Sequence, residues 1–522
     1  MLMSLQLIYG PSGSGKSYTL YKKIIEQSIR EPDREFIVIV PEQFTMQTQR
    51  ELVELHPNRG ILNIDVQSFL RLAWRIFEEV GVDTHTVLED TGKNLLLRRV
   101  ASRQKNDLTV LGRNFRKPGY ISQVKSIISE LKQYDVSLEE LDEQLRSGKK
   151  DALSYKLQDI RNLYEGFQEE LQGKYITSEE ILEELCYVVK KSEILKGCVV
   201  ALDGFTGFTP IQNKLLRELM QTAEKIYVTV TLDAWEDPMK KVSMHKLSYL
   251  SKKTIQQLAG AAKECGCMLE KPEVLGKEGS IRFRSAPALR FLERHLFRPG
   301  NQIYEAQDSQ KLERELSLHV ARDAKAEAEF AARTIWHLVR EENLRYRDIA
   351  VITGDMESFG DHMKKELQQK GIPCFIDRTR KLLLNPLVEF LRAALQIAAK
   401  SFRYESMFRY LRTGLAGLKK DEIDRLENYV LANGINSRRR WEEPWDEQEE
   451  PFKEKILPPL LAFVDQVREK DGTVRQKTEA LYYLMVHYGI EQKMQDYREK
   501  FEQEEAYDLA REYEQIYGIV IR

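Results

Sequence analysis

The chain has 522 residues, of which 80 are basic and 82 are acidic, giving a formal net charge of −2 at pH 7. It is too long for a single hydrophobic core, and its balanced charge excludes a general nucleic-acid coat, so any polyanion site must be local. Five cysteines without a C-x-x-C pair form neither a disulfide framework nor a complete metal site. We find no bilayer-spanning apolar run and no signal peptide, and therefore expect a cytoplasmic protein.

The N-terminal region has the pattern of a βαβ unit. Apolar runs at 5–9 and 35–41 predict two short buried strands, and the apolar spacing at 17–29 predicts a helix between them. Strands joined in this way are parallel, with a right-handed crossover. The N-terminus is therefore expected to be α/β.

A helical insertion is expected to interrupt this first sheet. Residues 86–195 have helical periodicity with few β-branched runs, whereas strand-like runs return at 198–204 and 225–232. We therefore assign 1–85 plus 196–300 to a first α/β domain and 86–195 to the insertion.

A second α/β signal follows a passage rich in Gly, Pro and charge. Three strands alternating with helices are expected at 316–323, 348–355 and 372–377. We assign 312–400 to the start of a second domain and 401–522 to a further helical insertion, with a loop expected at 438–451. This second sheet is short of strands, so we expect the sequence to be part of a longer protein.

The stretch GPSGSGKS lies between the first predicted strand and the first predicted helix, the context that the motif G-x-x-x-x-G-K-[ST] requires. Its glycines let backbone N–H groups converge on a phosphate at the positive end of the helix. The expected ATP-phosphate contacts are Gly10, Pro11, Ser12, Gly13, Ser14, Gly15, Lys16 and Ser17. The sequence therefore predicts a P-loop NTPase fold that binds ATP with Mg²⁺.

The second acid of the predicted site is Asp203, at the end of the strand predicted at 198–204. We expect Ser17 and Asp203 to hold the magnesium ion. In active P-loop enzymes a nearby residue positions the attacking water, but the residue after Asp203 is Gly204. We therefore expect weak or no hydrolysis and assign no catalytic residue.

The order of segments is that of superfamily 1 helicases, with tandem RecA-like domains and large helical insertions. Four stretches point to one family within this superfamily. They are VPEQFTMQTQREL (40–52), DVQSFLRLAWRIF (65–77), ALDGFTGFTPIQNKLL (201–216) and RYRDIAVITGDMESF (345–359). They closely resemble the AddB (RexB) family, subunits of the bacterial AddAB (RexAB) ATP-dependent helicase/nucleases. The likeness covers essentially the whole chain, and only the N-terminal, helicase-like portion of that family.

The resemblance implies a non-motor subunit that pairs with an AddA-type helicase/nuclease motor. The heterodimer processes double-strand DNA ends for homologous recombination, and the AddB-type member of the pair binds single-stranded DNA and takes part in Chi recognition. The family's 5′→3′ nuclease and its 4Fe–4S cluster belong to a C-terminal domain that is absent from this sequence. We therefore assign no cluster ligand or nuclease residue.

Loops after the early strands of helicase-like folds face single-stranded DNA, where aromatic side chains stack on bases and polar ones hold phosphates. Carried over to this sequence, the DNA-binding candidates are Gln43, Thr45, Phe69, Arg71, Trp74, Phe205, Phe208 and Gln212. A purely structural interpretation stays open, because Phe69, Trp74 and Phe77 also fit one apolar helix face.

Three other functions remain open on these residues. The chain could be an active superfamily 1 DNA helicase, which Gly204 opposes. It could be a P-loop kinase for a small metabolite, which the second α/β unit opposes. It could also be an architectural DNA scanner in which the nucleotide loop has no role.

Overall fold

The computed structural model describes residues 3–82, 86–104, 107–115, 117–147, 151–298, 300–305, 308–376 and 382–521. It divides into two compact units, Met1–His319 and Val320–Arg522. Each unit has its own core.

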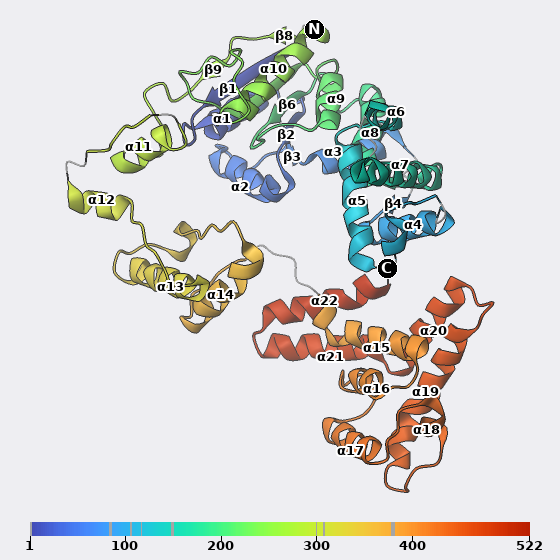
Figure 1. Cartoon of the computed structure of the whole chain (residues 1–522). Coiled ribbons are helices and arrows are strands. Elements are labelled where there is room, and N and C mark those ends of the chain that lie inside the picture. The colour runs from blue at the N-terminus through green and yellow to red at the C-terminus, as the bar shows by residue number, and fades with distance from the viewer. Residues whose placement is uncertain are drawn as a thin grey trace. The chain divides into compact units, whose positions relative to one another are not determined.

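The first unit is built on a parallel sheet with the strand order β3-β2-β6-β7-β1-β8, in which β9 also pairs with β1 (Figure 1). The strands are β1 (Ser4–Gly10), β2 (Phe36–Ile39), β3 (Ile64–Gln67), β6 (Val199–Leu202), β7 (Lys225–Thr231), β8 (Met268–Leu269) and β9 (Glu273–Val274). The four strands predicted for this domain are confirmed. Strands β3, β8 and β9 were not predicted; β8 and β9 have only two residues each, which is too few to show a periodicity.

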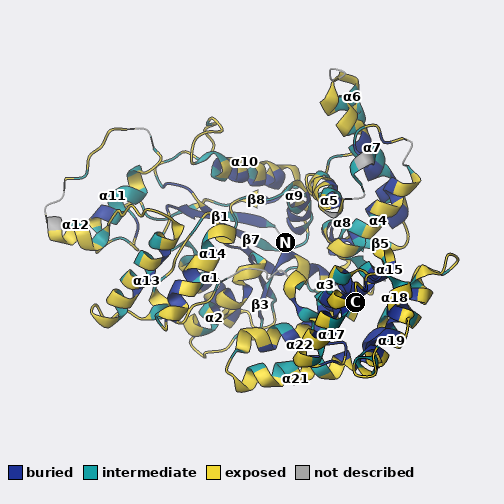
Figure 2. Cartoon of the chain, turned by 60° about the horizontal axis from the view of Figure 1, so that its bottom comes forward, coloured by how far each residue is buried: buried dark blue, intermediate teal, exposed yellow. Residues whose placement is uncertain are grey.

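Helices cover both faces of this sheet, because successive strand residues point to opposite sides. Ile8 and Val38 face a core that includes α1 (Lys16–Arg30) and α2 (Thr45–Leu55). Leu7 and Ile39 face the opposite core. That core is completed by α3 (Phe69–Val80), α8 (Ser178–Val188), α9 (Pro210–Leu219) and α10 (Tyr249–Glu264). In Figure 2 the central strands β1 and β7 are dark blue between helices with exposed outer faces, whereas the short strand β8 is exposed, so the fold is a three-layer α/β sandwich.

The helical insertion forms a satellite core of its own. Its elements are β4 (Thr86–Leu88), α4 (Asp90–Arg103), α5 (Pro118–Gln133), α6 (Leu138–Ser147), α7 (Ala152–Leu171) and β5 (Tyr175–Thr177), with β4 and β5 paired in parallel. Leu97, Ile121 and Phe167 are buried together at its centre. The fully buried Asp159 carboxylate accepts hydrogen bonds from the backbone N–H groups of residues 109, 110 and 111. This carboxylate therefore ties the 109–111 loop to α7.

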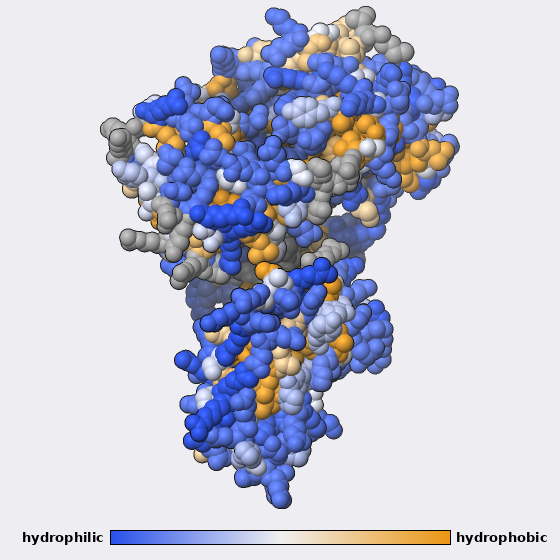
Figure 3. Space-filling model, turned by 90° about the vertical axis from the view of Figure 1, so that its right-hand side faces the viewer, coloured by the Kyte–Doolittle hydropathy of each residue, from blue (hydrophilic) through white to orange (hydrophobic). Residues whose placement is uncertain are grey.

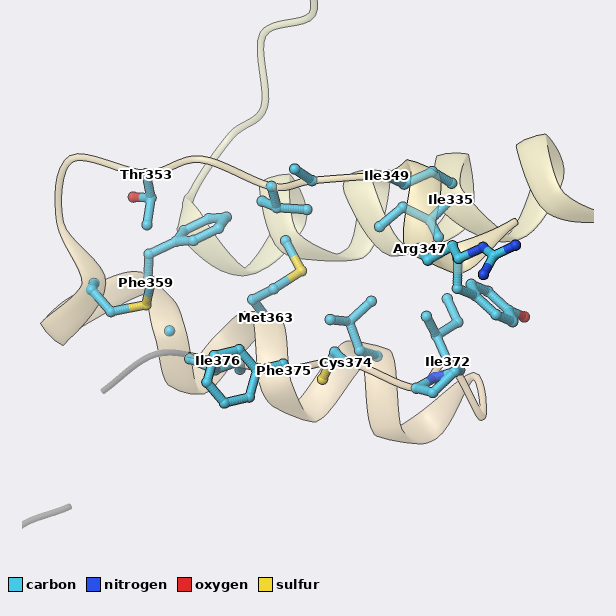
Figure 4. A pocket seen from close by; sticks show the side chains of 17 residues that line it. Ile335, Arg347, Ile349, Thr353, Phe359, Met363, Ile372, Cys374, Phe375 and Ile376 are labelled. Atoms are coloured by element: carbon cyan, nitrogen blue, oxygen red, sulfur yellow. The ribbon is translucent and has the colours of Figure 1, made fainter. Parts of the chain in front are cut away.

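The strands expected at 316–323, 348–355 and 372–377 are not formed, because none of their described residues pairs into a sheet and Asp348 ends a short 3-10 helix. Beside them lie α13 (Ala324–Arg340) and α14 (Met356–Gln369), which share a small core. Ile352 and Phe375 are more than 90 % exposed. Figure 4 shows an apolar cavity of about 700 Å³ between the segment carrying Ile349 and that carrying Cys374, over Met363. Extended segments need neighbouring strands, and none is described next to these.

The rest of the second unit is helical, as expected. It comprises α15 (Pro386–Lys400), α16 (Tyr404–Leu411), α17 (Lys420–Ala432), α18 (Arg438–Glu442), α19 (Glu450–Arg468), α20 (Val474–His487), α21 (Ile490–Gln503) and α22 (Tyr507–Ile521). The loop predicted at 438–451 is wrong in its first part, where α18 places Trp441 fully inside the core. Because most residues around Trp441 are charged, the sequence analysis did not identify this buried side chain.

The face of the molecule in Figure 3 is mostly hydrophilic, with small separate hydrophobic patches. No helix in the described part of the chain has the length and apolarity needed to cross a membrane.

Replacing Asp159 by Asn should loosen the insertion, because the amide cannot accept all the N–H groups that the carboxylate accepts. We expect the free energy of opening at residues 109–111 to fall by about 2–3 kcal/mol. Hydrogen exchange with mass spectrometry measures this directly. The control is Asp151→Asn, since Asp151 caps the same helix at an exposed position where Asn caps equally well. Unchanged protection at 109–111 in Asp159→Asn would contradict the assignment.

Candidate functional site: a phosphate loop and a neighbouring aromatic cavity

The glycine-rich loop joins β1 to α1, as the motif requires. Gly13 and Gly15 have φ angles of 71° and 88°, in the left-handed region that side chains disfavour. A Cβ atom at Gly10 would lie 2.6 Å from the Leu275 carbonyl oxygen, and one at Gly13 would lie 2.6 Å from Ser280 Oγ. Both the conformation and the close packing of the loop therefore require these glycines.

Residues 275–282, the covering segment, press against this loop from outside. The Leu275 N–H donates to the Tyr9 carbonyl at 2.8 Å, and the Arg282 N–H donates to the Gly13 carbonyl at 3.2 Å. From the sequence this passage was interpreted only as a separator between domains. Its Gly-rich composition instead allows it to approach the loop closely, a role that no spacing rule indicated.

The Lys16 side chain folds back over the loop. Its Nζ donates to the carbonyl oxygens of Gly10 at 3.1 Å and Pro11 at 2.9 Å. Burial lowers the pKa of Lys16, and the nearby Asp203 partly opposes this shift. Ser14 Oγ is buried and has no hydrogen-bond partner among the described residues. A cation and an unpartnered hydroxyl at the start of a helix fit an anionic phosphate ligand.

Asp203 directly follows β6 and is 5 % exposed. Its Oδ2 accepts a hydrogen bond from the Tyr21 hydroxyl at 2.8 Å, and its Oδ1 accepts one from the Thr229 hydroxyl. Ser17 is half-buried in the first turn of α1. A serine hydroxyl and a carboxylate are oxygen donors of the kind magnesium prefers, so the residue types fit that ion.

The residue after Asp203 does not supply a second carboxylate. Gly204 is exposed with a φ angle of 77°, a conformation that a glutamate would adopt only with strain. The backbone itself therefore disfavours an acid at this position.

A cavity of about 590 Å³ opens beside the loop, lined among others by Pro11, Ser12, Asp233, Glu293 and Arg298. Arg298 binds Asp233 with two donors, Nε at 3.0 Å and Nη2 at 2.8 Å. Burial raises the pKa of Glu293, which lies on α11 (Pro287–His295). These acidic and basic side chains come from distant stretches of sequence, and the sequence analysis did not find them.

Three of the predicted DNA-facing aromatics, Phe69, Phe205 and Phe208, meet beyond the C-terminal end of β6, the end that Asp203 also follows. Phe69 lies 5.4 Å from Phe205 and 6.5 Å from Phe208, measured between ring centroids. Phe69 is buried, whereas the other two rings are half-buried. Phe205, but not Phe208, lines a cavity of about 480 Å³ together with Phe69, Leu70 and Gln212.

The polar candidates differ in how accessible they are. Gln43 is exposed, but Thr45 is buried with its hydroxyl donating to the Glu42 carbonyl. Arg71 forms an exposed ion pair with Glu42 at 2.9 Å, and Gln212 caps α9 by accepting from the Thr209 N–H. Direct DNA contact by Thr45 would therefore require a rearrangement.

Trp74 fits both the DNA-binding and the structural interpretation of its sequence. It is 37 % exposed, and its ring packs edge-on against the buried Phe77 at a centroid distance of 5.9 Å. One side of this ring belongs to the core, while the other is open to solvent.

Comparison with known proteins adds family information to this geometry. A family model described as "ADDB, N-terminal" matches residues 7–293, and one described as "UvrD-like helicase C-terminal domain" matches residues 284–520. The second match supports the superfamily 1 helicase-like fold.

Similar curated proteins are each named as the B-type subunit of an "ATP-dependent helicase/deoxyribonuclease". That of Lachnoclostridium phytofermentans is 44 % identical over 99 % of this chain and 46 % of its own length. Those of Clostridium novyi and Clostridium kluyveri are each 34 % identical with the same coverage. The chain thus spans about half the length of these relatives. Because the ADDB model matches more than half of the 522 residues, the chain belongs to the ADDB family.

Proposed function

We propose that this chain is the nucleotide- and DNA-binding, non-motor part of a heterodimeric ATP-dependent helicase/nuclease that acts in the cytoplasm. Its partner is an AddA-type motor protein, and the complex processes double-strand DNA ends for homologous recombination with regulation by Chi. The names of its relatives support a helicase/deoxyribonuclease assignment. We place the 5′→3′ nuclease and a 4Fe–4S cluster in the part of the relatives that this chain does not match.

The observation that supports the proposal best is the geometry of the phosphate loop. Left-handed glycines, the N-terminus of α1 and Lys16 converge where a triphosphate would bind. When a triphosphate binds, Lys16 Nζ would leave the carbonyl oxygens of Gly10 and Pro11 and bind the phosphates. Ser17 and Asp203 would hold magnesium. Bound magnesium would offset the negative charge of the phosphates.

Gly13→Ala should abolish ATP binding, whereas Gly197→Ala should preserve it. Both glycines have a φ angle of 71°, but a Cβ atom meets Ser280 Oγ at 2.6 Å only at Gly13 and meets nothing within 4 Å at Gly197. The pair therefore separates close packing of the loop from backbone strain. Isothermal titration calorimetry with ATP and magnesium measures the affinities. Equal affinity in both variants would contradict the proposed site.

We further propose that ATP turns over slowly, because no acid follows Asp203 to position water. A missing general base typically costs about 10²- to 10⁴-fold in rate. We therefore expect less than about 0.1 turnovers per second, against roughly 10 per second for a typical enzyme. A coupled ATPase assay with single-stranded DNA measures this rate. Turnover of tens per second by this chain alone would instead identify an active motor.

The DNA-binding part of the proposal assigns the aromatic cavity to an unpaired base. Phe205 lines this cavity and packs against Phe208, which does not line it, with their ring centroids 5.2 Å apart. Gln43, Arg71 and Trp74 offer further exposed contacts on the adjoining elements. We propose supporting roles for the buried Thr45 and Phe69, and Gln212 lies at the cavity rim.

Phe205→Ala should weaken binding of a single-stranded oligonucleotide by roughly 5- to 100-fold, since stacking on an aromatic contributes about 1–3 kcal/mol per base. Phe208→Ala is the matched control, because it truncates an equally half-buried ring that does not line the cavity. Fluorescence anisotropy at fixed salt concentration measures both affinities. Similar losses in the two variants would show that packing, not stacking, is responsible.

A further inference from the structure

A chain of buried hydrogen bonds ends on the second acid of the phosphate site. The Tyr21 hydroxyl donates to Asp203 Oδ2 at 2.8 Å, and it lies 3.3 Å from Thr48 Oγ1. Because the single Tyr21 proton is given to Asp203, Thr48 must be the donor in the second contact. Thr229 donates to the other carboxylate oxygen. Each oxygen of Asp203 therefore has a protein donor.

Tyr21 lies on the helix that begins at the phosphate loop. It follows Ser17 by four residues on α1, so the two side chains share one helix face, and it is 3 % exposed. A phenol hydroxyl keeps its proton at physiological pH, so Tyr21 stays a donor toward Asp203.

A carboxylate oxygen that accepts a buried hydrogen bond is a poorer acceptor for a second donor. Bonds to charged acceptors are stronger than neutral ones, and a low-dielectric site strengthens them further. In a phosphate-loop site, Asp203 would use a remaining lone pair of one of these oxygens to hold a magnesium-bound water. The Tyr21 hydroxyl and that water would then share one carboxylate oxygen, and the bond to Tyr21 would weaken the bond to the water.

We propose that Tyr21 is a positioning residue whose hydrogen bond draws on the Asp203 carboxylate, weakening the hold of Asp203 on magnesium and so the coupling between magnesium and nucleotide binding. This inference rests on the proposed ATP site. It gives a second structural reason for weak hydrolysis, independent of Gly204. Through Thr48 the restraint also reaches α2, the helix that follows the exposed Gln43.

The test measures ATP affinity by calorimetry, once with magnesium and once with EDTA. The affinity with magnesium divided by the affinity in EDTA is the magnesium ratio. Tyr21→Phe removes only the hydroxyl, and we expect this ratio to rise about tenfold, the lower end of the effect of one hydrogen bond to a charged group. Affinity in EDTA should stay within about twofold, since the phosphate loop is unchanged.

The matched control is Tyr227→Phe. Tyr227 is also buried in the first unit, but its hydroxyl accepts from Gln27 at 2.7 Å and does not contact Asp203. Its magnesium ratio should equal that of the unmodified chain. In an Asp203→Asn background, Tyr21→Phe should no longer change the ratio. Should Tyr21→Phe fold poorly, Thr229→Val frees the other oxygen and should raise the ratio in the same direction.

An unchanged ratio in folded Tyr21→Phe, or an increase that persists with Asp203→Asn, would overturn the inference while leaving the ATP site intact. Absence of ATP binding to the unmodified chain, with and without magnesium, would overturn the proposed site and this inference together. The two failures are therefore distinguishable.

Discussion

The close packing of the covering segment against the phosphate loop and the end of β1 is the constraint on which the rest of this site depends. The loop, the covering segment and the end of β1 meet at distances that leave no room for a Cβ atom at Gly10 or Gly13. Hydrogen bonds from Leu275 and Arg282 fix the covering segment to β1 and to the loop. The conformation of the loop is thus held by packing without a ligand, which would lower the cost of ordering the loop if the proposed nucleotide binds there.

The parallel sheet places the other functional groups around this loop. The pairing of β6 with β7 ends at Leu202 and Val228, which brings the next residues, Asp203 and Thr229, into contact, while α1 supplies Tyr21 from the adjoining layer. The aromatic cavity is built on the residues that follow the same strand β6. One strand end therefore connects the proposed nucleotide site to the proposed DNA site, and the buried Thr48–Tyr21–Asp203 contacts provide a physical link between them.

The sequence was sufficient to predict features carried by local pattern. The loop motif, its flanking strand and helix, and the return of the sheet at β6 and β7 follow from apolar runs and glycine spacing. It was insufficient for features made by long-range packing, such as the covering segment and the Arg298–Asp233 pair. The buried positions of Thr45 and Phe69 likewise depend on tertiary contacts. In the second unit the sequence instead predicted strands that the described residues do not form, because a strand-like sequence forms no sheet without neighbouring strands.

The central claim is that the glycine loop clasps a nucleotide triphosphate through the backbone at the head of α1. A crystal structure of the chain with magnesium and an unhydrolysable ATP analogue tests it most directly. The account predicts that backbone N–H groups of residues 13–17 bind the β-phosphate and that Lys16 Nζ leaves the carbonyls of Gly10 and Pro11. An analogue bound elsewhere, with Lys16 still on those carbonyls, would contradict it.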